Sequence, residues 1–117
     1  MKLSLFDLHC DTVYEMRKQR QSLWENTLAV SLQKAAVFDH YIQVLAHWTD
    51  SSLEEEEGWL AFHAMLGYLK NDPALKKQAQ SISTLLLSVE DARILAGKIE
   101  RIDELYRLGI RILTPLW

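Results

Sequence analysis

The chain has 117 residues, of which 49% are hydrophobic and 25% charged, and its net charge is −3. This size and composition predict one globular domain and exclude two. The scattered basic residues argue against nucleic-acid binding, and the single cysteine excludes an internal disulfide. The apolar runs are much shorter than a membrane span and no signal-peptide pattern is visible, so we expect a cytoplasmic protein without a membrane segment.

The first predicted element, a strand over residues 3–9, carries the most informative pattern. Because side chains alternate along a strand, Asp7, His9 and Asp11 are predicted to share one face at its carboxyl end. Cys10 is predicted to point to the opposite face as a buried, inert thiol. One imidazole and one or two carboxylates suit zinc or a similar divalent ion. The same triplet also fits an ordinary edge strand with polar residues at its exit.

The next segments alternate between helix and strand. A helix is predicted from Thr12 to about Arg20, with Asp11 or Thr12 as its cap. Thr12 is favoured, because an Asp11 that binds metal cannot also be a free cap. Residues 21–40 show mixed patterns, within which Ser31 is predicted to cap a short helical turn. Residues 41–48 are almost continuously apolar, which is typical of a parallel strand covered on both faces.

A long helix is predicted after the second strand. We expect it to start with a capping box between Ser52 and Glu55, and glutamates 54–57 suit the positive end of the helix dipole. It is predicted to end before Pro73, where a short helix capped by Asp72 begins.

A third buried strand is predicted over residues 84–89, with Glu90 at its carboxyl end. A further helix is predicted to stop at Gly109, and residues 110–114 form the fourth predicted strand. This alternation indicates an α/β fold with parallel strands, right-handed crossovers and outer helices. A small doubly wound sheet and the first half of a (β/α)8 TIM-type barrel both fit, since a complete barrel takes about 250 residues.

Three segments together resemble the membrane dipeptidase (renal dipeptidase) family of metallopeptidases. They are residues 6–12 (FDLHCDT), 87–90 (LSVE) and 105–114 (LYRLGIRILT), in the family's order. The resemblance runs from the first strand to the last residue. It implies an amidohydrolase-like (β/α)8 barrel, of which residues 1–117 would form the N-terminal portion as a single incomplete domain.

The resemblance also implies a site. His9 and Asp11 match the family's metal-binding H-x-D motif, and Glu90 matches a glutamate that bridges two zinc ions. Family members hydrolyse dipeptides with a metal-bridging hydroxide, and several accept a D-residue on the carboxyl side. Asp7 matches an upstream acidic position, and we expect it to support the ligands without binding metal.

The remaining ligands and the proton-handling acid of the family come from the second half of the barrel, which has no counterpart in these residues. His40 and His63 are expected to be structural. His47, at the end of the second strand, is the one remaining histidine that could line the rim of the site. A structural role is nevertheless favoured for it too.

Three ligands shared over two zinc ions are too few, so we expect the isolated chain to lack dipeptidase activity. A half barrel also leaves two open edges and an uncovered inner face, which predicts self-association or a need for the missing C-terminal half. Two other hypotheses stay open. One is a different amidohydrolase-type metal hydrolase, although most of these carry H-x-H on the first strand. The other is a non-catalytic α/β remnant that acts as an interaction domain.

Overall fold

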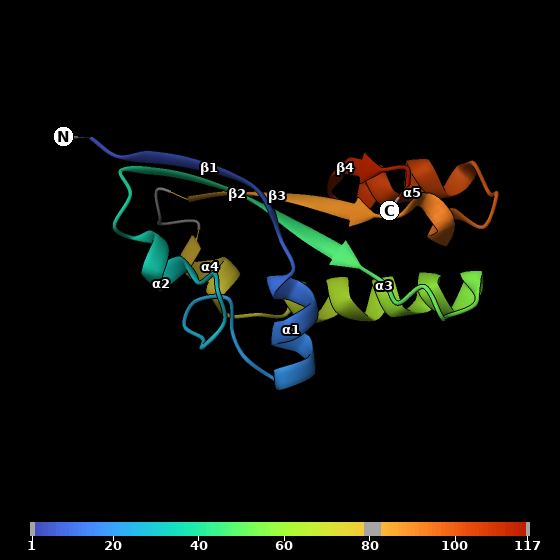
Figure 1. Cartoon of the computed structure of the whole chain (residues 1–117), viewed down its shortest axis with the longest axis horizontal. Coiled ribbons are helices and arrows are strands. Elements are labelled where there is room, and N and C mark those ends of the chain that lie inside the picture. Colours follow the sequence, from blue (N-terminus) through green and yellow to red (C-terminus); the bar gives the residue numbers. More distant parts are fainter. Residues whose placement is uncertain (1, 79–82, 117) are drawn as a thin grey trace.

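The computed structural model describes residues 2–78 and 83–116 and shows one sheet with helices packed on it (Figure 1). Its strands are β1 (Ser4–Cys10), β2 (His40–Trp48), β3 (Ser83–Glu90) and β4 (Ile110–Thr114). Its helices are α1 (Thr12–Gln19), α2 (Leu32–Ala35), α3 (Glu55–Lys70), α4 (Ala74–Gln78), the 3-10 turn η1 (Ala92–Leu95) and α5 (Glu100–Leu108). Among the described residues, no helix has the length and apolar character needed to cross a membrane.

All strand pairs are parallel and follow the chain in the order β1-β2-β3-β4. The α/β fold with parallel strands is therefore confirmed. A doubly wound sheet reverses its strand order at a switch point, whereas a barrel wall adds each strand beside the preceding one. The observed order is that of about half a barrel wall, with α1 to α4 beneath the sheet in the view of Figure 1.

The hydrophobic core lies between the sheet and its helices, as two neighbouring clusters. In the first, Leu45 of β2 packs with Met16 of α1 and Leu69 of α3. In the second, Val89 of β3 packs with Phe62 of α3, and both α5 and β4 contribute to it. The apolar strand β2 is buried along most of its length, as its composition predicted.

The start of α3 differs from the prediction. The carboxylate of Asp50 accepts the backbone N–H of Ser52 at 2.9 Å, so Ser52 belongs to a turn before the helix. The N-cap is Glu54, and its backbone N–H donates to Glu57 at 3.1 Å within a capping box. The expected box between Ser52 and Glu55 is therefore wrong, while the acidic first turn of the helix is confirmed.

Other helix ends agree with the sequence. Ser31 caps α2 by accepting the backbone N–H of Lys34, and Asp72 accepts that of Ala74 at the start of α4. Asp72 also accepts the backbone N–H of Leu23 at 2.6 Å, which fastens the segment after α1 to the end of α3. The η1 turn was not predicted, because its four residues are too few to show a helical period.

His47 is a core residue. Its side chain is fully buried, its ring lies 5.7 Å from that of Phe62, and its Nδ1 lies 3.0 Å from the carbonyl oxygen of Ser88. The structural role favoured for His47 is therefore confirmed. The alternative place on the rim was wrong, because His47 shares the helix-covered face of β2 with Leu45, two residues before it. Burial lowers the pKa of His47 to about 4.

We expect Gly109→Ala to lower the free energy of unfolding by about 1 kcal/mol. Gly109 ends α5 at a φ of 102°, which is costly for any residue with a Cβ, although the nearest atom to such a Cβ would be 3.9 Å away. Gly67→Ala is the matched control, because Gly67 lies inside α3 with open space around it, and it should stabilise by about 0.5–1 kcal/mol. Urea unfolding measures both, and equal effects would contradict the assigned backbone conformations.

His47 should make the stability of the fold depend on pH. Since its folded pKa, about 4, lies below the ordinary value of 6.5, its contribution is present above pH 6.5 and is lost as the pH falls toward 4. The expected loss between pH 6.5 and 5 is about 2 kcal/mol. His47→Gln should remove this part of the profile in urea unfolding at several pH values, while exposed His40→Gln should keep it. An unchanged slope in His47→Gln would show that another group causes it.

Candidate metal centre

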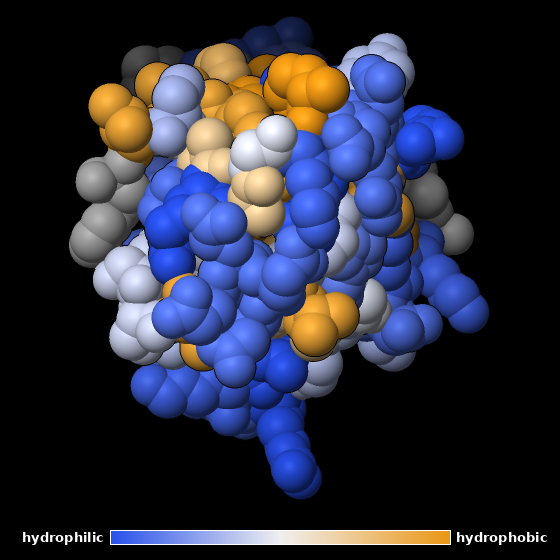
Figure 2. Space-filling view, turned by 90° about the vertical axis from the view of Figure 1, so that its right-hand side faces the viewer, coloured by the Kyte–Doolittle hydropathy of each residue, from blue (hydrophilic) through white to orange (hydrophobic). Residues whose placement is uncertain are grey.

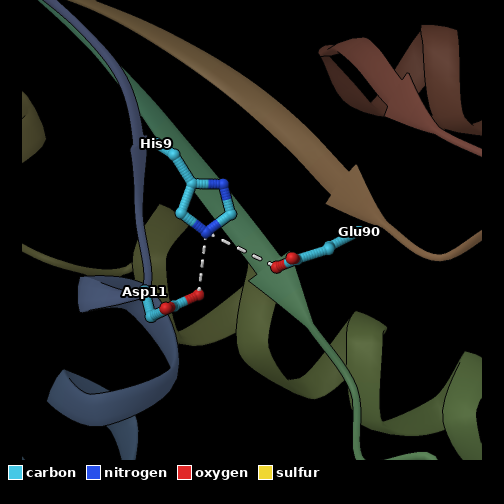
Figure 3. Close-up of side chains that lie close together, drawn as sticks. All are labelled: His9, Asp11 and Glu90. Carbon is cyan, nitrogen blue, oxygen red and sulfur yellow. Dashed lines mark hydrogen bonds and ion pairs between the residues drawn. The ribbon is translucent and has the colours of Figure 1, made fainter. Parts of the chain in front are cut away.

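Three side chains from two distant segments of the chain meet at the carboxyl edge of the sheet (Figure 3). His9 is near the end of β1, Asp11 directly precedes α1, and Glu90 is the last residue of β3. His9 Nε2 lies 3.3 Å from Asp11 Oδ1 and 3.6 Å from Glu90 Oε2. Each of the three residues offers one nitrogen or oxygen atom that could bind a metal, and these atoms all lie within 4.8 Å of one another.

These distances fit a shared divalent ion. Zinc binds nitrogen and oxygen ligands at roughly 2.0–2.2 Å, so two ligands of a tetrahedral ion lie about 3.3–3.5 Å apart. Both distances from His9 are close to this spacing. The Glu90 side chain is 13% exposed, whereas those of His9 and Asp11 are 49% and 59% exposed, so the group is open to solvent on one side.

The strand that carries His9 does not alternate regularly. Asp7 pairs with Gln43 and Cys10 pairs with Leu45, so three steps along β1 oppose two along β2. This is a β-bulge, and it puts Asp7 and Cys10 on the same, helix-covered face. The expectation that Asp7 shares a face with His9 was therefore wrong. Cys10 is buried as predicted, and burial raises the pKa of its thiol.

Asp7 nevertheless contacts His9 through the main chain. Its Oδ1 accepts the backbone N–H of His9 at 3.1 Å. A bulge interrupts the ladder of hydrogen bonds between strands, and this carboxylate satisfies the N–H at the interruption. Asp7 thus holds the backbone from which the His9 ring projects.

The carboxylate of Asp11 is not used to cap α1. Asp11 occupies the N-cap position, and Thr12, the expected cap, is the first residue of the helix instead. The Asp11 side chain makes no capping hydrogen bond and turns toward His9 (Figure 3). Its backbone carbonyl accepts the N–H of Glu15, so the helix fixes Asp11 while leaving its carboxylate available to a ligand.

The other histidines do not join this group. His47 lies in the core, and His40 is exposed at the opposite, amino-terminal end of β2. His63 is half-buried on α3 and pairs with Glu104 of α5 at 3.4 Å.

A cavity of about 240 Å³ adjoins the group, and its walls include residues that the sequence did not single out. Asp11 and Glu90 line it together with Tyr14, Glu15 and Trp48. Tyr14 and Glu15 lie in the first turn of α1, three and four residues after Asp11, and Trp48 ends β2. Their positions in the helical turn that follows Asp11 and at the carboxyl end of a strand are the signal that could have found them.

Comparison with known proteins gives a match in structure but none in sequence. No protein-family model and no curated protein matches the chain. The chain is similar to a metallopeptidase from Rhodobacter sphaeroides that was solved with a phosphinate mimic of the dipeptide L-Ala-D-Ala. The TM-score is 0.73 and the sequence identity 16%, over 100% of this chain and 46% of that protein. The chain thus spans less than half the length of that metallopeptidase and has the fold of the matching part.

Proposed function

We propose that residues 1–117 are the N-terminal part of a zinc-dependent dipeptidase that resembles the membrane dipeptidase family, with His9, Asp11 and Glu90 as metal ligands. The observation that carries this proposal is the placement of His9 Nε2 within 3.6 Å of both carboxylates at the carboxyl edge of the sheet. The metallopeptidase fold supports it, and so does the dipeptide mimic bound by the structural neighbour.

The bound metal would act as a Lewis acid toward the scissile carbonyl and the attacking water. The chain's own residues would hold that ion in place. His9 offers Nε2, Asp11 offers a carboxylate that no helix cap uses, and the two oxygens of Glu90 can serve two ions. Asp7 fixes the backbone of His9 and so limits the movement of its ring.

The activity of the complete enzyme would need ligands from outside these residues. A catalytic zinc usually has three protein ligands and one open position, so two ions need more than His9, Asp11 and Glu90. We therefore propose that residues 1–117 form about half of one barrel domain, and that the chain by itself does not hydrolyse dipeptides.

We expect the dialysed chain to bind Zn²⁺ through this group. His9→Ala and Glu90→Gln should each weaken Zn²⁺ affinity at least about tenfold, because even residues that only orient ligands contribute about 10–100-fold. Isothermal titration and elemental analysis measure affinity and stoichiometry. His40→Ala and Glu104→Gln are the matched controls outside the group and should leave the affinity unchanged. Equal losses in all four variants, or no Zn²⁺ binding by the wild type, would contradict the assigned ligands.

The sheet face opposite the helices carries exposed apolar side chains. Phe6 and Leu8 of β1 are 52% and 68% exposed, and Ile112 of β4 is also exposed. In the described residues β1 pairs with β2 alone and β4 with β3 alone, so each has an unpaired edge. Figure 2 shows hydrophobic residues gathered at the top of the molecule, the side that carries β4 and α5 in Figure 1. Such edges and apolar surfaces promote association.

We therefore expect the isolated chain to associate with itself at micromolar concentration, in place of the rest of a barrel. Sedimentation should show species larger than a monomer, and Leu8→Glu should shift them toward the monomer by placing a charge on the open face. Leu60→Glu, which places the same charge on the exposed side of α3, is the control and should have little effect. A monodisperse wild-type monomer would contradict this expectation. Association without Zn²⁺ binding would favour the second candidate, a non-catalytic interaction domain.

A further inference from the structure

The cavity beside the candidate metal group combines aromatic rings with carboxylates. Tyr14 and Trp48 supply the rings, and Asp11, Glu15 and Glu90 supply the acids. The cavity lies between the first turn of α1 and the carboxyl ends of β2 and β3. A group bound there would therefore lie directly beside any ion held by Asp11 and Glu90.

The aromatic wall is suited to a cation. The rings of Tyr14 and Trp48 pack edge to face with their centroids 5.0 Å apart, which fixes both side chains. The faces of such rings attract ammonium and guanidinium groups. The Tyr14 ring already attracts one ammonium of this chain, since Lys18 Nζ lies 5.8 Å from its centroid.

Glu15 keeps a negative charge at this cavity that the metal would not neutralise. Asp11 and Glu90 belong to the metal group, but Glu15 does not. The partner of its carboxylate is the neutral amide of Gln19, whose Nε2 donates to Glu15 Oε2 at 2.8 Å. No ion pair found among the described residues includes Glu15.

A purely structural role explains only part of this arrangement. An acidic residue in the first turn of α1 suits the helix dipole, and a pair four residues apart supports the helix. Neither interaction requires the side chain to line a cavity that also contains two of the three metal-group residues.

We propose that Glu15 is a specificity-determining residue that selects dipeptides with a cationic side chain. The ammonium of a lysine or the guanidinium of an arginine would enter between the Glu15 carboxylate and the aromatic pair. This inference rests on the proposed dipeptidase function and names the substrate class of that site.

The test compares two probes that differ only in the ammonium group, L-lysyl-D-alanine and L-norleucyl-D-alanine. Chemical-shift titration of the ¹⁵N-labelled 117-residue chain, with and without Zn²⁺, gives both affinities. The lysine probe should bind about fivefold more tightly, as expected for one ion pair aided by an aromatic face. The shifts should centre on Tyr14, Glu15 and the Trp48 indole.

Glu15→Gln should abolish this preference and leave Zn²⁺ affinity unchanged. Glu25→Gln removes the same charge at an exposed position away from the cavity and should retain the preference. Equal binding of the two probes to the wild type, no binding of either, or a preference that survives in Glu15→Gln would overturn the proposal. The proposed function is tested separately. It fails if the wild-type chain does not bind Zn²⁺, whereas the preference between the two probes is also measured without metal.

Discussion

Parallel pairing of β1, β2 and β3 is the constraint on which the candidate site depends. It brings the carboxyl ends of three strands to one edge, although His9 and Glu90 lie 81 positions apart in the sequence. Hydrogen bonding between β2 and β3 runs without interruption from Tyr41 to Trp48, so the level of Glu90 is fixed against Trp48. Glu90 can then meet His9 across the end of β2.

The bulge in β1 is an irregularity of the sheet that also helps to position His9. A regular strand would give Asp7 and His9 the same face, and the extra residue turns them apart. Asp7 then bonds the backbone of His9, while the imidazole faces the two carboxylates. Bulges near functional sites commonly re-aim a side chain in this way. The start of α1 positions the second side chain of the group. Its N-cap residue Asp11 bonds to the helix only through its main chain, so the carboxylate can face His9.

The same sheet geometry that brings His9, Asp11 and Glu90 together also leaves surfaces uncovered. The helix-covered face of the sheet has two well-packed clusters, while the opposite face exposes Phe6, Leu8 and Ile112. A closed barrel buries such residues in layers and removes both edges. The proposed need for further metal ligands and the apolar open face both fit the proposal that these residues form about half of one barrel. The acidic, aromatic cavity at Glu15 is lined by described residues of this chain, so its chemistry can be tested on this chain.

The sequence by itself determined the order of the elements and the residues of the candidate metal group. Periodicity, caps and the glycine at position 109 are local properties, and they predicted β1 to β4 and the longer helices within a few residues. His9 and Asp11 were identified from one short segment at the end of the first strand, and Glu90 from another at the end of the third strand. Only the tertiary structure decided which face each side chain takes. The rim position of His47 failed because register with β3 and packing on Phe62 place it in the core, and Asp7 was misplaced because a bulge depends on the neighbouring strand. Tyr14, Glu15 and Trp48 line one cavity for the same reason, since the contacts between α1 and β2 are tertiary contacts between distant parts of the sequence.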